Sequence, residues 1–529
     1  MESAPSPGHP SREASTDIDT TRLSRPAAAR SRTLPAPPAP RKPGTAPSPP
    51  AAPGPAHRLG LLLPPLLALA TGLWGIRRDG ALWQDEAVTY EMAHRPLPGL
   101  WATLAGADAV HGLYYLLMHG VFTLWEGGPA TLRLPSVLAT AGAAAGVAAL
   151  GRRLAGPRAG LAAGVLFPLL PAVQRYAQEG RSYALVTALV VAQTWLLLRA
   201  CTERGGRRRT WWAGYALLSA LAGLLHEFAL LALPAHGIAL LASRAPRAVR
   251  RAWARAACGA AVTVTPLVLL SLRQSGQVAW IHVSLTGDVA GFLLPAAVGV
   301  AAAAVVRRGS AGPAPGPRPH TWALPLLLVP PALLLLASAV RPLYVDRYVL
   351  WSQAGLALLV GAALDRLSRQ ARARGLLAPV LAAAAVAALW PVGTHLRDPG
   401  SRTDDTLAIG RAVAQVARPG DAVLFVPASR RVWTLSREPA SYGAVDLALA
   451  VSPRAGHTLY GTELPAPGIR SRMLRVSRIV VVHDPARDRR EADERERTKK
   501  ATLRAHFTPC GGRTVGVARI VVHERGSRC

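Results

Sequence analysis

From Leu59 onward, the chain alternates long apolar runs with short breaks rich in arginine, glycine or proline. Each run is long enough to cross about 30 Å of hydrocarbon as a helix. The pattern predicts a mainly α, polytopic membrane protein with about eleven transmembrane helices. The predicted cores of these helices are residues 59–76, 134–150, 159–174, 183–199, 211–225, 228–242, 253–272, 287–306, 321–340, 348–364 and 375–393.

The two ends of the chain lack this pattern. Residues 1–58 are rich in proline and arginine without apolar periodicity, which predicts a disordered tail, and the apolar run that follows predicts a retained signal anchor. Residues 394–529 predict a small α/β domain, separate from the membrane domain of residues 59–393. Within it we expect a helix over 404–417, capped by Asp or Thr, and strands over 421–427, 478–484 and 515–524.

The distribution of arginines along the chain indicates how it is oriented in the membrane. Only 17% of residues are charged, yet the formal net charge is +31. The basic residues concentrate in alternate loops whose only acids are Glu203 and Asp365, as expected for cytoplasmic loops. This bias predicts a cytoplasmic N-terminus and an extracytoplasmic C-terminal domain in the plasma membrane, and makes nucleic-acid binding the least favoured explanation of the charge. The predicted cytoplasmic loops are residues 151–158, 199–210, 243–256, 307–320 and 365–374.

The first outer loop, residues 77–133, is too long for a simple connection. It begins ALWQDEAVTYEMAHRP, which places Asp85 and Glu86 just after the first span. Residues 111–125 are amphipathic and aromatic-rich but short, so they predict an interfacial helix on the outer leaflet rather than a further span. An acidic pair in a solvated loop is by itself a weak signal.

Three more outer turns carry polar residues at the edge of the membrane. The sequence QRYAQEGRSYAL contains Glu179 and Arg181, LLHEFALL contains His226, and RPLYVDRYVLW contains Arg341 and Arg347. Ionisable groups at this depth usually face a cavity or a partner, although an ion pair of Glu179 with Arg181 or Arg175 is an equally good structural explanation. Arginine among aromatic residues suits phosphate binding, whereas tyrosine and tryptophan there also serve as interface anchors.

Taken in order, WQDEA, a histidine before LYYLL, RLPS, GRRLAG, YAQEGRSYAL, HEF and DRYVL resemble the GT-C superfamily of polyprenyl-phosphate-sugar-dependent glycosyltransferases. The resemblance covers about residues 59–393 and is greatest to the bacterial protein O-mannosyltransferase and aminoarabinose transferase group. The domain at 394–529 is similar to that of actinobacterial relatives. The chain has His111-Gly112-Leu113 where relatives commonly have His-Pro-Pro.

This resemblance implies an inverting transfer of a sugar, mannose by default, from polyprenyl phosphate to an acceptor hydroxyl at the outer membrane face. Asp85 is then the expected general base, because a hydroxyl needs a proton acceptor as it attacks. Glu86 is expected to orient Asp85, to hold a cation or to keep the loop polar. Arg347, Arg181 and Arg341 are the candidates for the donor phosphate. Glu179, His226 and His111 are candidates for an acceptor or metal site.

The residues do not establish any cofactor, and they leave open whether a divalent cation binds. The expected partners are a polyprenyl-phosphate-linked sugar, a protein, glycan or glycolipid acceptor, and membrane lipid. Two other functions compete: a flippase for a lipid-linked saccharide, and a non-catalytic membrane anchor that binds cell-wall polymer. The four cysteines form no zinc motif. Cys510 and Cys529 either pair in an oxidising compartment or stay free.

Overall fold

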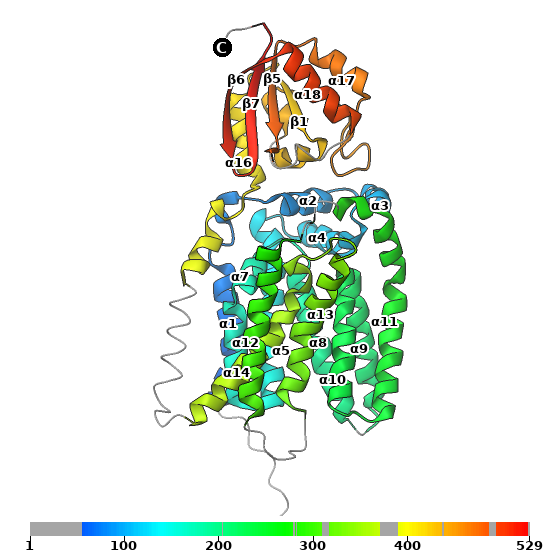
Figure 1. The fold of residues 1–529 in the computed structure, drawn as a ribbon, viewed down its shortest axis with the longest axis vertical. Helices are drawn as coiled ribbons and strands as arrows, with labels where there is room; N and C mark the ends of the chain where they lie inside the picture. The colour runs from blue at the N-terminus through cyan, green and yellow to red at the C-terminus, as the bar shows by residue number, and fades with distance from the viewer. Residues whose placement is uncertain are drawn as a thin grey trace, which may run out of the picture. The chain divides into compact units, whose positions relative to one another are not determined.

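The computed structural model describes residues 55–203, 205–278, 281, 283–308, 317–370, 390–435, 438–485 and 493–526. These residues form a helical bundle followed by a small mixed sheet with helices (Figure 1). The predicted tail over residues 1–58 lies almost entirely outside the described residues. Most of the last predicted span, residues 375–393, also lies outside them.

The predicted membrane helices are present throughout the described part of the bundle. Each predicted core from 59–76 to 348–364 falls on a helix. Six helical segments are long and apolar enough to span a membrane, and three shorter apolar helices accompany them, so the count of eleven stays a prediction. The long segments are Pro129–Ala155 (α5), Tyr183–Thr202 (α8), Arg247–Arg273 (α11), Thr286–Arg307 (mainly α12, Ala290–Arg307), Pro319–Ser338 (α13) and Asp346–Gln370 (η6, Asp346–Ser352, with α14, Gln353–Gln370).

The remaining helices of the bundle are shorter. Figure 1 shows α2 and α4 lying across one end of the bundle rather than along it, as expected for the interfacial segment over 111–125. The bounds are α1 Pro55–Leu73, η1 Arg78–Gly80, α2 Gln84–Ala93, α3 Leu97–Gly106, η2 Ala109–His111, α4 Gly112–Leu124, α6 Pro157–Leu169, α7 Pro171–Ala177, α9 Arg208–Leu225, η3 Glu227–Leu231, α10 Ala232–Ala242, η4 Ser275–Val278 and the π-turn η5 Leu285–Val289.

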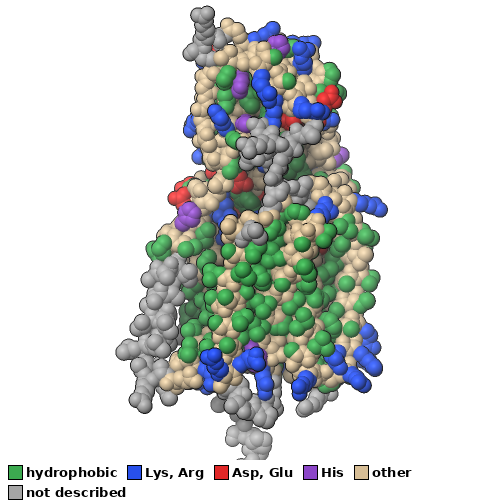
Figure 2. Space-filling model, in the orientation of Figure 1, with side chains coloured by type: hydrophobic (Ala, Val, Ile, Leu, Met, Phe, Trp, Pro, Cys, Tyr) green, Lys and Arg blue, Asp and Glu red, His purple; other side chains and the backbone are tan. Residues whose placement is uncertain are grey.

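Small residues allow the central helices to approach closely. A Cβ atom added at Gly151 of α5 would lie 2.7 Å from the Cα of Gly160 in α6, so any larger side chain there would force the two backbones apart. Such contacts are typical of membrane helices, which gain little from hydrophobic association in lipid and pack through small residues instead. Figure 2 shows hydrophobic side chains on the side of the bundle and basic side chains at the end away from α2 and α4; these are arginines, because the described bundle has no lysine.

The C-terminal part contains a five-stranded sheet in the order β2-β1-β5-β7-β6. The β1–β2 and β1–β5 pairs are parallel, and β5–β7 and β6–β7 are antiparallel. Every side chain of β1 is buried, as expected for a central strand covered on both faces. The bounds are η7 Pro399–Ser401, α16 Thr406–Val416, β1 Ala422–Val426, η8 Ala428–Thr434, η9 Pro439–Tyr442, β2 Val445–Asp446, β3 Leu449–Val451, β4 Thr462–Glu463, α17 Ala466–Met473, β5 Arg478–His483, α18 Glu494–His506, β6 Thr508–Val515 and β7 Ala518–Glu524.

Most elements predicted for this domain are confirmed. The helix predicted over 404–417 is α16, and Asp405 caps it by accepting a hydrogen bond from the Leu407 N–H at 3.0 Å. The strand predicted over 515–524 is wrong at its start. The chain turns at Gly516, whose φ is +56°, so β6 ends at residue 515 and β7 begins at residue 518. The sequence hid this turn because Val515 and Val517, on either side of Gly516, extend the apolar alternation of β7 toward the N-terminus.

The described cysteines differ in oxidation state. Cys510 is disulfide-bonded, whereas Cys201 and Cys258 are free. Cys529, the partner considered from the sequence, lies outside the described residues. Of the two alternatives that the sequence left open for Cys510, a disulfide and a free thiol, the structure has the disulfide.

A short strand-like contact joins the C-terminal part to the first outer loop. The Thr406 N–H donates to the Leu82 carbonyl at 2.7 Å, the Leu82 N–H donates to an Asp405 Oδ1 at 3.3 Å, and Trp83 and Asp405 form an isolated antiparallel bridge. These bonds hold the residues that lead directly into α2, and so they fix where α2 begins.

Candidate active site

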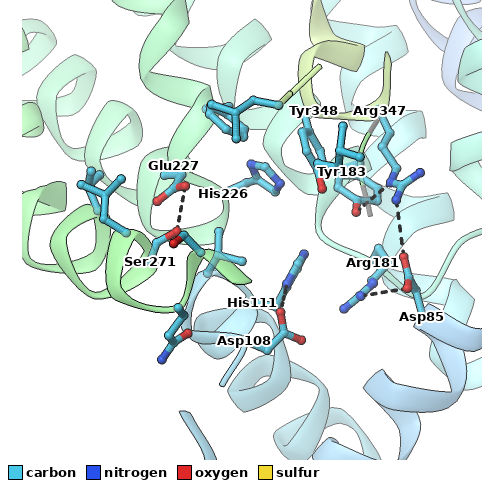
Figure 3. A pocket seen from close by; sticks show the side chains of 18 of the residues that line it. Asp85, Asp108, His111, Arg181, Tyr183, His226, Glu227, Ser271, Arg347 and Tyr348 are labelled. Carbon is cyan, nitrogen blue, oxygen red and sulfur yellow. Dashed lines mark hydrogen bonds and ion pairs between the residues drawn. The ribbon is translucent and has the colours of Figure 1, made fainter. Parts of the chain in front are cut away.

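A cavity of about 380 Å³ lies where residues 77–133, the ends of several helices and a loop of the C-terminal part meet (Figure 3). Its lining combines a charged side with an apolar side. The charged and polar residues are Asp85, Asp108, His111, Arg181, Tyr183, His226, Glu227, Ser271, Gln274, Ser275, Arg341, Arg347, Tyr348 and Tyr460, and the apolar ones include Val88, Phe228, Leu230, Leu231, Val268, Leu272, Ile281, Leu343 and Leu459.

Asp85 lies in the first turn of α2, where the helix dipole favours a carboxylate. Its Oδ1 is 3.5 Å from an Nη of Arg181, and its Oδ2 is 3.7 Å from an Nη of Arg347. Both distances exceed those of a charge-assisted hydrogen bond. The side chain is 20% exposed. The carboxylate is thus held between two cations by charge alone, and it keeps room to accept a proton from a third group.

Arg347 enters the cavity from η6 and is oriented by aromatic groups. Its Nε donates to the hydroxyl of Tyr183 at 3.1 Å, and its guanidinium lies 5.5 Å from the ring centroid of Trp83 and 5.6 Å from that of Tyr348. Such contacts fix the plane of a guanidinium while leaving its edge for other partners. Arg341 lines the same cavity but is exposed, and it donates to the Ser275 carbonyl at 3.0 Å.

A chain of hydrogen bonds connects Arg181 to His111. Arg181 donates to the hydroxyl of Tyr115 at 2.9 Å, and that hydroxyl donates to Asp108. Asp108 also lies 2.8 Å from the His111 Nδ1. Burial would raise the pKa of Asp108, but the charge and hydrogen bond of His111, together with Arg181 and Tyr115, outweigh it and hold this pKa well below its usual range. The structure therefore places an ionised carboxylate beside His111.

Glu86 is adjacent to Asp85 but does not line the cavity. It is completely buried and forms a two-pronged ion pair with Arg133 of α5, with N–O distances of 2.7 and 2.6 Å. The Gly180 N–H donates to the same carboxylate at 3.0 Å. Burial opposes ionisation, but the adjacent Arg133 lowers the pKa of Glu86 below its ordinary value. Arg133 and Gly180 thus bond both oxygens of the Glu86 carboxylate, and these bonds anchor α2 to the bundle.

Glu179 likewise points away from the cavity lining. Its Oε1 accepts a hydrogen bond from Arg402 at 2.8 Å, and both side chains are buried. Arg402 belongs to the segment that leads into α16, so this pair joins the second outer loop to the C-terminal part. Burial, partly opposed by Arg402, raises the pKa of Glu179.

His226 and its neighbour lie on the opposite wall from Asp85 (Figure 3). The His226 ring centroid is 4.7 Å from that of Tyr348 and 5.8 Å from that of His111. Glu227 accepts a hydrogen bond from the Ser271 hydroxyl at 3.0 Å. Among the described residues, no group of three or more His, Cys, Asp or Glu side chains lies close enough together to hold a metal ion.

The structure thus brings together Asp85, Arg181, Arg347, His111 and His226, places Arg341 at the exposed side, and puts Glu86 and Glu179 elsewhere. Sequence reasoning missed Asp108, Tyr115 and Tyr460. The spacing of Asp108 and His111, three residues apart, was a usable signal. Nothing local marks Tyr460, which comes from the C-terminal part.

The chain resembles the GT-C glycosyltransferases, as predicted from the sequence motifs. The family model of dolichyl-phosphate-mannose-protein mannosyltransferases matches residues 113–270. The structure is similar to the crystal structure of ArnT from Cupriavidus metallidurans in the apo state, with a TM-score of 0.58, 15% identity, and coverage of 88% of this chain and 98% of that one.

The same transferase bound to undecaprenyl phosphate gives a TM-score of 0.51 at 14% identity, with 88% of this chain and 97% of that chain covered. No curated protein matches in sequence. These comparisons confirm the predicted resemblance, and at this identity the structural ones show a shared fold.

Proposed function

We propose that this protein transfers a sugar, mannose by default, from a polyprenyl-phosphate donor to an acceptor hydroxyl at the outer face of the cytoplasmic membrane. One observation carries the proposal: the carboxylate of Asp85 lies between the guanidinium groups of Arg181 and Arg347 in a cavity that also has an apolar wall. A sugar linked to a lipid through phosphate needs all three surfaces: a carboxylate for the transfer, cations for the phosphate and an apolar wall for the lipid.

The chemistry follows from the positions of these groups. Asp85 takes the proton of the acceptor hydroxyl while that oxygen attacks the anomeric carbon, and the bond from this carbon to the phosphate oxygen breaks on the opposite side. The sugar is thereby inverted, and the electron pair stays on the departing polyprenyl phosphate. Arg347 and Arg181 stabilise the charge that grows on the phosphate, because preorganised cations act most strongly in a site shielded from water.

The apolar wall suits the polyprenyl chain. Leu230 and Leu231 of η3 and Val268 and Leu272 of α11 line the cavity. Figure 3 shows Glu227 and Ser271, from the same two elements, across the cavity from Asp85. Leu272 is 58% exposed, so the wall continues onto the outer surface of the described bundle. A lipid-linked donor can therefore enter from the membrane with its phosphate leading toward the arginines.

The distribution of charge supports the direction of the reaction. The basic side chains gather at the end of the bundle away from α2 and α4 (Figure 2), as expected for the cytoplasmic side. The cavity lies at the other end, and its charged groups converge there rather than forming a path through the bilayer, which favours a transferase over a flippase. A reporter fused after Gly400 should be active only outside the cytoplasm; activity only inside would overturn this orientation.

The decisive experiment compares Asp85→Asn with Asp79→Asn. Purified protein is incubated with radiolabelled polyprenyl-phosphate mannose and membrane extract. Asp85→Asn keeps the shape of the side chain but removes the base, so we expect transfer to fall about 10²–10⁴-fold without loss of thermal stability. Asp79 is an exposed acid of the same loop outside the cavity, and its variant should transfer at the wild-type rate. Wild-type turnover by Asp85→Asn would exclude Asp85 as the base.

A further inference from the structure

One wall of the cavity does not come from the bundle. Leu459 and Tyr460 belong to the loop between β3 and β4 of the C-terminal part, yet both line the cavity with Asp85 and Arg181. The role of this wall depends on how firmly the loop is held and on what the Tyr460 side chain offers to a ligand.

The loop is held from the side of the bundle by a buried arginine. Arg95, which follows α2 and is 2% exposed, donates to the Thr458 carbonyl at 2.9 Å. Its other nitrogens bond Glu91 at 3.0 Å and the Thr103 hydroxyl at 2.6 Å. Glu91 also pairs with Arg454 of the loop at 3.2 Å. Two arginines and one carboxylate thus fix the loop against α2 and α3.

The loop is held from the other side by a second buried network. Arg431 of η8 donates to the Tyr460 carbonyl at 2.8 Å. The same guanidinium pairs with Asp446 at 2.6 Å and with Glu463 at 2.9 Å, and Lys499 completes the group by pairing with Glu463 at 2.8 Å. Burying so many charges costs desolvation energy that apolar side chains would avoid. Both networks end on the same short stretch, residues 458–460, so their shared effect is to fix Tyr460.

Tyr460 lies within electrostatic reach of Asp108, Asp85 and Arg181 of the same cavity. Burial, followed by the charges of Asp108 and Asp85, raises the pKa of Tyr460 to about 12. The phenol therefore keeps its proton at neutral pH and can donate it in a hydrogen bond. A protonated phenol can both donate a hydrogen bond to an uncharged hydroxyl and accept one from it.

We propose that Tyr460 binds the acceptor, so that the C-terminal part completes the active site with an acceptor subsite for an uncharged, hydroxyl-bearing group. This inference rests on the proposed transfer reaction. The donor phosphate uses Arg181 and Arg347, and its lipid uses the apolar wall. Tyr460 lines the same cavity as Asp85 and lies within reach of its charge, and the acceptor hydroxyl must lie beside Asp85 to be deprotonated.

The test separates acceptor use from donor binding. Tyr460→Ala and Tyr460→Phe are assayed for transfer from radiolabelled polyprenyl-phosphate mannose to a limiting amount of membrane extract, and for stabilisation by undecaprenyl phosphate in thermal unfolding. Labelled product is separated into precipitated protein and solvent-extracted glycolipid, which identifies the source of the hydroxyl. We expect Tyr460→Ala to lower transfer at least 10-fold and Tyr460→Phe about 3-fold or more, both recovering partly at high extract concentration, with stabilisation by undecaprenyl phosphate unchanged.

Tyr90→Phe is the control, because it also removes one tyrosine hydroxyl, which bonds Glu126 at 3.1 Å, but outside the cavity. It should transfer at the wild-type rate. Wild-type transfer by both Tyr460 variants would overturn the inference and leave the proposed function standing. Equal loss of undecaprenyl phosphate binding would also overturn it, by assigning Tyr460 to the donor. If Tyr460→Ala does not fold, Tyr460→Phe decides alone. Absence of transfer by the wild type would instead refute the proposed function.

Discussion

Asp85 and Glu86 are neighbours in the chain, but they belong to two different regions of the molecule. Asp85 faces a cavity, is 20% exposed, and meets its two arginines at 3.5 and 3.7 Å. Glu86 faces α5, is fully buried, and meets Arg133 at 2.6 Å. Successive residues of a helix point about 100° apart, so one turn of α2 directs one acid toward solvent and the other into the bundle.

The difference separates a carboxylate available for chemistry from one used for stability. Glu86 has short bonds on both oxygens, from Arg133 and the Gly180 N–H, so a proton transfer there would break them. Asp85 has no such short bond to either arginine, and its pairing can be exchanged for a substrate. Variants that affect stability and activity separately can test this contrast.

The largest expected effect is on folding. Glu86→Gln keeps the shape of the side chain but leaves the Arg133 charge buried without a counter-ion, which typically costs about 3–5 kcal/mol of the free energy of unfolding. Thermal unfolding in detergent should show a large decrease, whereas Asp85→Asn should unfold near the wild-type temperature. If the Glu86→Gln protein has normal stability but transfers no sugar, Glu86 takes part in the reaction, and the distinction between a catalytic Asp85 and a structural Glu86 is wrong.

The next effect is on the donor. Arg347→Lys keeps the charge but loses the planar guanidinium that binds phosphate through two parallel hydrogen bonds. We therefore expect kcat/KM for polyprenyl-phosphate mannose to fall by a factor that corresponds to a loss of about 1–3 kcal/mol in transition-state stabilisation. Thermal stability should change little. If the variant instead unfolds in detergent while the surviving molecules turn over normally, Arg347 is structural and the phosphate site lies at Arg181 or Arg341.

A smaller effect should follow from weakening the support of α2. Asp405→Ala removes the cap of α16 and the bond to the Leu82 N–H, with an expected loss of about 0.5–2 kcal/mol in stability and a matching decrease in kcat as the start of α2 loosens. Asp398→Ala is the control, because Asp398 caps η7 on the same segment without touching residues 81–83. Equal decreases in kcat for both variants would show that the contact with Leu82 does not support Asp85.

The last effect concerns pH. Burial, then the charge of Asp85, raises the pKa of Asp404 to about 6 from 3.8. Between these values the unfolded chain loses its proton while the folded chain keeps it, so this group lowers stability as pH rises from about 4 to 6. Asp404→Asn should remove that part of the pH dependence of the unfolding temperature and stabilise the protein at pH 7. An unchanged pH profile would show that Asp404 ionises normally.

Much of the fold was predictable because its signals are local. Apolar length located the helices, and the cap and apolar alternation located α16, β1 and β5. The motif order also located Asp85 and Arg347. The pairing of Glu86 with Arg133 was not predictable, because the two are 47 positions apart and a dipeptide of acids does not show which member is buried.

The same limit applies to the cavity. Asp108 adopts a left-handed conformation, with φ of +58°, at the turn before η2, and only the packing of that turn brings it beside Tyr115. Tyr460 reaches the cavity through a loop whose own sequence carries no motif, held by arginines from distant elements. Contacts between residues so far apart in the sequence produce no periodic pattern that could have predicted them.

The bond between Leu82 and Asp405 joins residues 323 positions apart, and this distance has a consequence for biosynthesis. At about 5–20 residues per second, the ribosome finishes residue 405 roughly 15–65 s after residue 82. Throughout that interval the loop that carries Asp85 lacks the partner that sets its conformation. The bundle therefore cannot complete its cavity until the C-terminal part has been synthesised. A truncated product released before that point would enter the membrane without a complete cavity.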